Sequence, residues 1–153
     1  MIVDLPDEAA TARLGAALAE AARPGDVIAL RGDLGTGKTA LARAFVRRLT
    51  TPDEEVPSPT FTLVQTYETD SVVVWHFDLY RLRDPHETIE LGIEEAFADG
   101  IALVEWPDRL GRLLPPGRLD VTLLPGGRPT ARRAELVGHG AWAERIARMA
   151  GHV

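Results

Sequence analysis

The sequence predicts a single α/β domain over residues 1–153, in three layers, with a mostly parallel central sheet and helices on both faces. Three observations support this prediction. Short apolar runs alternate with amphipathic segments at helical spacing. With 153 residues, 45% of them hydrophobic, the chain can bury one sizeable core. A glycine-rich segment joins the apolar run 27–30, typical of a buried parallel strand, to a helical segment at 40–49.

The first half of the chain contains the clearest helical pattern. Residues 7–22 predict a helix because their apolar side chains recur on one face, and residues 2–5 before them predict a short strand. Three prolines exclude regular structure from residues 50–60, the longest polar loop, and long loops in compact domains are often functional. The runs 63–68 and 72–79 then predict a β-hairpin.

The second half begins with a strong helix start. In Asp84-Pro85-His86-Glu87, Asp is a suitable N-cap and Pro and Glu suit the first turn, so we expect a helix reaching about residue 98. The remaining predicted elements are a buried strand at 101–104, a strand pair at 119–124 and 132–137, and a terminal helix at 141–150.

Composition excludes several classes of protein. The chain has no cysteine, which rules out disulfide scaffolds, thiolate metal sites and cysteine nucleophiles and fits a reducing compartment. No apolar run approaches the ~20 residues of a membrane span. The N-terminus lacks the basic start and apolar stretch of a signal peptide, so we expect a cytoplasmic protein with no membrane partner. The net charge of −6 argues against a protein that binds nucleic acid unaided.

The glycine-rich segment fits G-x-x-x-x-G-K-[ST], the phosphate-binding loop, in its proper context between a strand and a helix. Its glycines let backbone N–H groups converge on phosphate oxygens, and the helix directs its positive end to the same place. Lys38 would reach the β- and γ-phosphates, and the Thr39 hydroxyl would bind Mg²⁺. The predicted nucleotide-binding residues of this loop are Gly32, Asp33, Leu34, Gly35, Thr36, Gly37, Lys38 and Thr39. The predicted fold is therefore that of a P-loop NTPase-like domain.

Lys38 is the only lysine among 17 basic residues. A compact ammonium fits over the phosphates where a planar guanidinium does not substitute well, which explains why this position alone is lysine. GTPases of this architecture read guanine with an [N/T]-K-x-D motif, which requires a second lysine. The sequence therefore favours ATP over GTP.

Two apolar runs end in a carboxylate, at Asp78 and at Glu105. In P-loop enzymes an acidic residue at the end of a neighbouring strand helps to hold Mg²⁺. The run before Glu105 is the more uniformly apolar, whereas the run before Asp78 has the character of a partly exposed hairpin. We therefore assign Glu105 to the metal side and Asp78 to orienting water or supporting the metal ligands, with Lys38, Asp78 and Glu105 as the catalytic residues.

Other polar residues give weaker signals. Thr60, with Ser58 as second choice, lies where P-loop switches carry a hydroxyl that senses the γ-phosphate. The four histidines are not at metal-ligand spacing. We interpret His76 as structural or near the site, and His86, His139 and His152 as surface residues.

Four segments together resemble one known family. They are G-D-L-G-T-G-K-T at 32–39, S-P-T-F-T-L-V at 58–64, H-F-D-L-Y-R-L at 76–82 and V-E-W-P at 104–107. The first is widely shared, but the others in this order and spacing resemble the TsaE (YjeE) family, small P-loop ATPases of bacterial tRNA threonylcarbamoyladenosine synthesis. The resemblance covers nearly the whole chain.

This resemblance implies a partner and a site. The family acts with TsaD and TsaB, and its ATP hydrolysis is thought to reset or regulate that complex, so tRNA would be contacted only indirectly. The equivalents of Thr39, Asp78 and Glu105 are regarded as essential, with Thr39 and Glu105 at Mg²⁺. The acidic net charge agrees with a protein that acts on a protein partner.

The resemblance also places three residues outside the loop close to the nucleotide. They are Glu8, Thr11 and Arg132, matched more loosely than the four motifs.

Two alternatives to an ATPase of tRNA modification remain at this stage. A small P-loop kinase would share the loop and the Mg²⁺ site, but it would also need an acceptor pocket and usually an arginine-rich lid, for which no insertion is evident. A regulator that binds nucleotide without useful hydrolysis differs mainly in not requiring both carboxylates.

Overall fold

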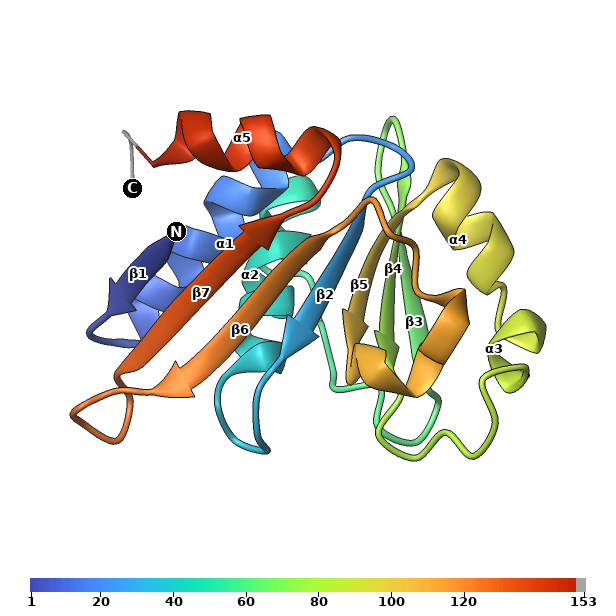
Figure 1. Cartoon of the computed structure of the whole chain (residues 1–153), viewed down its shortest axis with the longest axis horizontal. Helices are drawn as coiled ribbons and strands as arrows, with labels where there is room; N and C mark the ends of the chain where they lie inside the picture. Colours follow the sequence, from blue (N-terminus) through green and yellow to red (C-terminus); the bar gives the residue numbers. More distant parts are fainter. Residues whose placement is uncertain (151–153) are drawn as a thin grey trace.

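The computed structural model describes residues 1–150, and over these residues a seven-stranded sheet has the order β1-β7-β6-β2-β5-β4-β3 (Figure 1). The strands are β1 (Ile2–Leu5), β2 (Val27–Arg31), β3 (Val64–Glu68), β4 (Val73–Asp78), β5 (Ile101–Glu105), β6 (Leu119–Pro125) and β7 (Arg132–Gly138). The four central strands, β6, β2, β5 and β4, are parallel, and the outer strands pair antiparallel. The predicted mixed α/β domain with a mostly parallel centre is confirmed.

Helices cover both faces of this sheet, as the alternating pattern predicted (Figure 1). One face packs against α1 (Glu8–Ala21), α2 (Lys38–Leu49) and α5 (Ala141–Met149). The other packs against α4 (Ile93–Asp99) and the 3₁₀ segment η1 (Pro107–Leu113), with the short α3 (Glu87–Glu90) alongside α4. Two apolar clusters, one on each side of the sheet, form the core.

The central strands read as continuous apolar runs because both of their faces are buried. In β5, Leu103 belongs to the cluster under α1 and α2, whereas its neighbour Val104 belongs to the cluster under α4 and η1. Ile28 and Val27 of β2 divide between the two faces in the same way. Alternation along each strand therefore decides which helix layer a side chain meets.

The helix expected to run from Asp84 to about residue 98 is instead broken into α3 and α4. Its start also lies later than predicted: α3 begins at Glu87 with His86 at its N-cap. The Asp84 carboxylate still accepts from the His86 N–H at 2.9 Å, and the Glu87 carboxylate accepts from the Asp84 N–H at 3.1 Å, so the hydrogen bonds expected of Asp84 are present in the turn before the helix. The break lies at Gly92, whose φ of +89° ends one helix and begins the next. A Cβ there would lie 2.8 Å from Trp75, so this glycine also permits close packing on β4.

Two of the three histidines interpreted as surface residues can be placed. His86 is exposed, and His139 is partly exposed with its Nε2 2.9 Å from Asp120 Oδ2. His152 lies outside the described residues. Within residues 1–150, every helix is too short or too polar to cross a membrane.

The parallel register positions the site. Leu30 at the end of β2 is paired with Glu105, and Asp78 at the end of β4 is paired with Glu105 on its other side. The carboxyl ends of β2, β4 and β5 therefore meet at one edge of the sheet, together with the loop that follows β2. Ligands of open α/β sheets bind at this edge.

Candidate nucleotide site

The loop between β2 and α2 is shaped by glycines. Gly32 has a φ of +139°, and a Cβ there would lie 2.6 Å from the backbone oxygen of Leu123. Gly37, with a φ of +99°, is the residue from which α2 begins. Non-glycine residues rarely adopt such angles, so the G-x-x-x-x-G-K-T pattern matches the observed backbone directly.

Lys38 is the first residue of α2 and its side chain is enclosed, with only 5% of the residue exposed. Its ammonium donates to the backbone oxygen of Gly32 and to that of Asp33, the latter at 3.1 Å. It also lies 3.9 Å from the centre of the Trp106 ring, a cation–π contact. The chain's one lysine is therefore part of the site rather than a solvated surface charge.

Burial lowers the pKa of Lys38 below its ordinary value, although the charges of Glu105, Asp78 and Asp33 act in the opposite direction. The ammonium is thus only partly compensated by its neighbours. Additional negative charge beside it, such as a phosphate chain, would favour its protonated form.

Glu105, at the end of β5, is 3% exposed and lies between two elements. The Thr39 hydroxyl of α2 donates toward both carboxylate oxygens, at 3.3 Å from Oε1 and 3.2 Å from Oε2. His76 of β4 places Nε2 2.6 Å from Oε2. The predicted pair of Thr39 and Glu105 is therefore brought together, and His76 proves to contact it directly.

Asp78, at the end of β4, is 6% exposed and engages loops instead. Its Oδ2 accepts from the Thr60 hydroxyl at 3.3 Å, and Thr60 is 2.8 Å from the Ser58 hydroxyl. Its Oδ1 accepts from the Tyr80 N–H at 3.1 Å. The expectation that the strand before Asp78 is a partly exposed hairpin is only half correct: β4 pairs antiparallel with β3, but it also lies beside β5 in the interior of the sheet.

The polar loop that carries Ser58 and Thr60 has no helix or strand over residues 50–63. Two arginines of α2 hold it in place. Arg43 Nε donates to the backbone oxygen of Val56 at 3.3 Å, and Arg47 Nε donates to that of Glu54 at 3.0 Å. The loop is thus attached to the helix that follows the glycine-rich loop.

These groups surround one cavity of about 370 Å³. Its lining includes the lysine, the hydroxyls and both carboxylates. The predicted residues that line it are Glu8, Leu34, Gly35, Gly37, Lys38, Thr39, Thr60, Asp78, Glu105 and Arg132. Gly32, Asp33 and Thr36 belong to the same loop but lie outside the lining.

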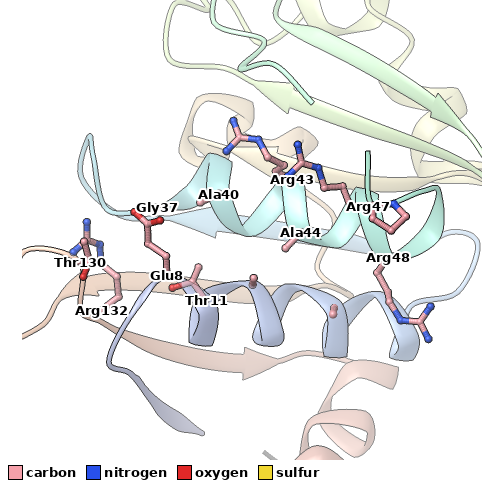
Figure 2. Close-up of a pocket in the computed structure, with 13 residues that line it drawn as sticks. Glu8, Thr11, Gly37, Ala40, Arg43, Ala44, Arg47, Arg48, Thr130 and Arg132 are labelled. Atoms are coloured by element: carbon pink, nitrogen blue, oxygen red, sulfur yellow. The ribbon is translucent and has the colours of Figure 1, made fainter. Parts of the chain in front are cut away.

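A larger cavity of about 600 Å³ lies next to the first, between α1 and α2 (Figure 2). The two share Glu8, Gly37, Ala40 and Arg132, and Thr11 lines the larger one. The Glu8 side chain points from α1 toward the start of α2 (Figure 2). The three residues suggested outside the loop therefore lie beside it, although the larger cavity holds neither Lys38 nor the two carboxylates.

Arg132, at the start of β7, is committed to backbone oxygens. Nε and Nη2 donate to the carbonyls of Thr36 and Gly35 at 2.8 and 2.9 Å, and Nη1 donates to those of Pro129 and Ala131, both at 2.7 Å. The guanidinium thus fastens the β6–β7 turn to the glycine-rich loop.

The donor set around Thr39 and Glu105 fits Mg²⁺. Both supply hard oxygen donors, and Mg²⁺ is commonly held by one or two protein groups together with substrate phosphates and waters. Within residues 1–150 no group of three or more His, Asp and Glu side chains forms a complete metal site.

The interpretation of His76 as structural or near the site is confirmed in its location, but its contact with Glu105 was not predicted, nor were the contacts of Trp106. His76 lies two residues before Asp78, and the alternation of a strand places both on one face, so the signal was present in the spacing. Trp106 follows Glu105 with a left-handed backbone, φ +57°, and its ring contacts Tyr80 at 5.0 Å between centroids as well as Lys38. No sequence pattern predicts this left-handed conformation at a tryptophan.

Comparisons with known proteins agree with this architecture. A family model described as "Threonylcarbamoyl adenosine biosynthesis protein TsaE" matches residues 5–133. The tRNA threonylcarbamoyladenosine biosynthesis protein TsaE of Rickettsia felis is 40% identical over 119 residues, which are 78% of this chain and 70% of that protein. The protein of the same name from Bacillus subtilis is 40% identical over 124 residues, 80% of this chain and 75% of that protein.

A solved structure shares the fold. The crystal structure of Bacillus subtilis YdiB matches with a TM-score of 0.80 and 28% identity, over 97% of this chain and 91% of YdiB. Fold and site together define a mixed α/β domain in which a G-x-x-x-x-G-K-T loop links the central strand to a helix and faces two strand-end carboxylates. The extent of the family match shows that the chain belongs to the TsaE family.

Proposed function

We propose that this protein binds and hydrolyses ATP with Mg²⁺ and acts in the cytoplasm in tRNA threonylcarbamoyladenosine biosynthesis, on or through a TsaB–TsaD complex. The observation that supports this most is the convergence of Lys38, Thr39, Asp78 and Glu105 on one cavity beside the glycine-rich loop. The biosynthetic role rests on family membership. The choice of ATP over GTP rests on the chain's single lysine.

In this proposal, each residue of the site has a separate role in ATP hydrolysis. Lys38 and the loop N–H groups bind the phosphates and stabilise the charge that develops as water attacks the γ-phosphate in line. Thr39 and Glu105 would hold Mg²⁺, which neutralises phosphate charge when bound. Asp78 and Thr60 orient the attacking water, since the Thr60–Asp78 hydrogen bond lies on the wall of the same cavity.

We expect the isolated protein to hydrolyse ATP slowly, because the described part of the chain places no arginine with free donors in the lining of the smaller cavity. Within residues 1–150, Arg132 is the one arginine that lines the smaller cavity, and its nitrogens donate to four backbone carbonyls. Arg81 lies over the Phe61 ring, 4.8 Å from its centre. A partner that supplies a cation or orders the loops would complete the site.

The test is steady-state release of phosphate from ATP by the purified protein with Mg²⁺, alone and titrated with the TsaB–TsaD pair. We expect a low rate that rises and saturates with the pair. A rate indifferent to the pair would remove the partner assignment. Transfer of label from γ-labelled ATP to a metabolite rather than to water would replace the ATPase with a kinase.

A further inference from the structure

His76 lies at the centre of the molecule and has one polar contact. The side chain is 0% exposed, and its Nε2 lies 2.6 Å from Glu105 Oε2. We propose that His76 is a positioning residue that holds the Glu105 carboxylate in place for Mg²⁺. This inference rests on the proposed function and assigns to that site a residue that does not line the cavity.

The register between β4 and β5 brings His76 and Glu105 close together. His76 is paired with Leu103 of the parallel strand β5, and Glu105 lies two residues beyond Leu103. Residues two apart point to the same face, so His76 and Glu105 are diagonal neighbours under α2, within reach of long side chains. The imidazole therefore approaches the carboxylate from the core side, whereas Thr39 approaches it from α2.

The hydrogen bonds around Glu105 show which of its two carboxylate oxygens His76 contacts. Within residues 1–150, Glu105 has hydrogen bonds from Thr39 and His76 and no Lys or Arg nitrogen within 4.0 Å of its carboxylate. His76 Nδ1 is buried without a partner in the same residues. The tautomer with its proton on Nε2 matches this arrangement, since a buried N–H at Nδ1 would be unsatisfied. His76 therefore donates to Oε2, whereas Oε1 meets only the Thr39 hydroxyl, the other proposed Mg²⁺ ligand, and is the oxygen placed to meet a cation.

A purely structural reason for a histidine at this position is weak. Its strand neighbours Val74 and Phe77 are fully buried, as is Leu103 across the register. A buried polar side chain costs free energy unless it is hydrogen-bonded, and an apolar residue would fill the space at lower cost. The one hydrogen bond of His76 goes to Glu105. The free-energy cost of burying the imidazole is therefore offset by an interaction with a residue of the site. Groups that hydrogen-bond to metal ligands orient those ligands, and their loss typically weakens metal affinity by about 10- to 100-fold.

The experiment compares three variants of the whole protein. His76→Leu removes the donor and keeps an apolar side chain. His76→Gln places an amide nitrogen near the position of Nε2, whereas His76→Asn places it near Nδ1, out of reach of Glu105. Binding of a fluorescent ADP analogue is measured in EDTA and then over a Mg²⁺ titration, with the melting temperature recorded for each protein.

We expect H76L and H76N to bind the analogue in EDTA as wild type does, but to need roughly 10- to 100-fold more Mg²⁺ for the Mg²⁺-dependent gain in affinity. H76Q should restore the requirement to within a few-fold of wild type. In the hydrolysis assay the same variants should raise the KM for Mg²⁺ more than they lower kcat.

A wild-type Mg²⁺ requirement in both H76L and H76N would overturn the inference while leaving the proposed function intact. Equal loss of binding in EDTA and in Mg²⁺ would do the same, because it would make the role of His76 structural. If H76L fails to fold, the contrast between H76Q and H76N decides. Absence of any nucleotide binding by the wild-type protein would instead overturn the proposed function and this inference with it.

Discussion

The two carboxylates that end β4 and β5 are paired in register and almost equally buried, yet their surroundings differ. Glu105 is held by elements of the core, through Thr39 at the start of α2 and His76 within the sheet. Asp78 is held by loops, through Thr60 and the N–H of Tyr80. One carboxylate is therefore held by residues of the central sheet and α2, and the other is hydrogen-bonded to the proline-rich loop.

Under the proposed function, this difference corresponds to the separate roles that we propose for the two carboxylates. A ligand for a cation benefits from fixed geometry, which packed strands and helices provide. A group that orients water must work with the loops that close over the substrate, and loops are where such adjustments occur.

The largest effect on nucleotide affinity is expected at Lys38, which lines the same cavity as both carboxylates. Lys38→Met keeps the aliphatic stem in its enclosed position but removes the ammonium, so MgATP affinity should fall roughly 10- to 100-fold, the value of a charge-assisted hydrogen bond. Titration with a fluorescent ATP analogue measures this, and a thermal melt checks the fold. Lys38→Arg, which keeps the charge, should not restore affinity. Undiminished affinity in K38M would remove Lys38 from the site.

Asp78→Asn should act on the rate at saturating Mg²⁺. Because a group that orients or deprotonates the attacking water contributes typically 100-fold or more, kcat should fall on the order of 100-fold while nucleotide affinity stays near wild type. Steady-state kinetics with a separate binding titration distinguish the two. If binding and turnover fall together, Asp78 belongs to the nucleotide-binding set instead.

Glu105→Gln should act on the metal requirement. Loss of the anionic oxygen should raise the Mg²⁺ concentration for half-maximal rate by at least ~10-fold, and excess Mg²⁺ should recover part of the activity. The comparison with D78N is the control, since D78N should leave this midpoint unchanged. Identical Mg²⁺ profiles for the two variants would erase the distinction between the carboxylates.

Thr60→Val tests the loop contact alone. It preserves shape but removes the hydroxyl that bonds Asp78 at 3.3 Å and Ser58 at 2.8 Å. A single hydrogen bond is worth about 0.5–1.5 kcal/mol, so kcat should fall roughly 2- to 10-fold. Ser58→Ala, which leaves the Thr60–Asp78 bond in place, is the matched control. A larger loss in S58A than in T60V would reverse the order assigned to these two hydroxyls.

A third carboxylate, Asp120, is the control for the other two, because we expect its replacement to change stability but not ATP hydrolysis. Burial alone would raise its pKa, but hydrogen bonds from Arg118 and His139 and the charges of Arg31 and Arg118 together lower it. A lowered pKa contributes stability that is present above the unfolded pKa of about 3.9 and is lost as pH falls through the folded pKa. Its contribution is therefore to folding at neutral pH.

Asp120→Asn should accordingly lower the melting temperature at pH 5–7, and the difference from wild type should shrink below about pH 4. ATP hydrolysis at a temperature where both are folded should remain unchanged. Thermal melts over a pH series and one rate measurement suffice. A pH-independent difference in melting temperature would show that the carboxylate's charge is not what stabilises the fold.

Sequence reasoning predicted the strands, the glycine-rich loop and the two strand-end carboxylates because these depend on local chemistry. Positive-φ glycines and continuous apolar runs each leave a recognisable pattern within a few residues. It placed one helix from Asp84 to about residue 98, whereas Gly92 divides it where the chain packs on Trp75 of another element. The glycine was visible in the sequence, but its packing partner was not.

The sequence by itself singled out the residues to which we assign phosphate and cation chemistry: one lysine within a glycine loop, followed by a threonine, and two carboxylates at strand ends. Only the tertiary structure decided how they divide the work. The parallel register of β4 and β5 sets His76 against Glu105, and the path of the proline-rich loop sets Thr60 against Asp78. Those pairings join residues 29 and 18 positions apart, and contacts at such separation are set by strand order and packing rather than by local pattern.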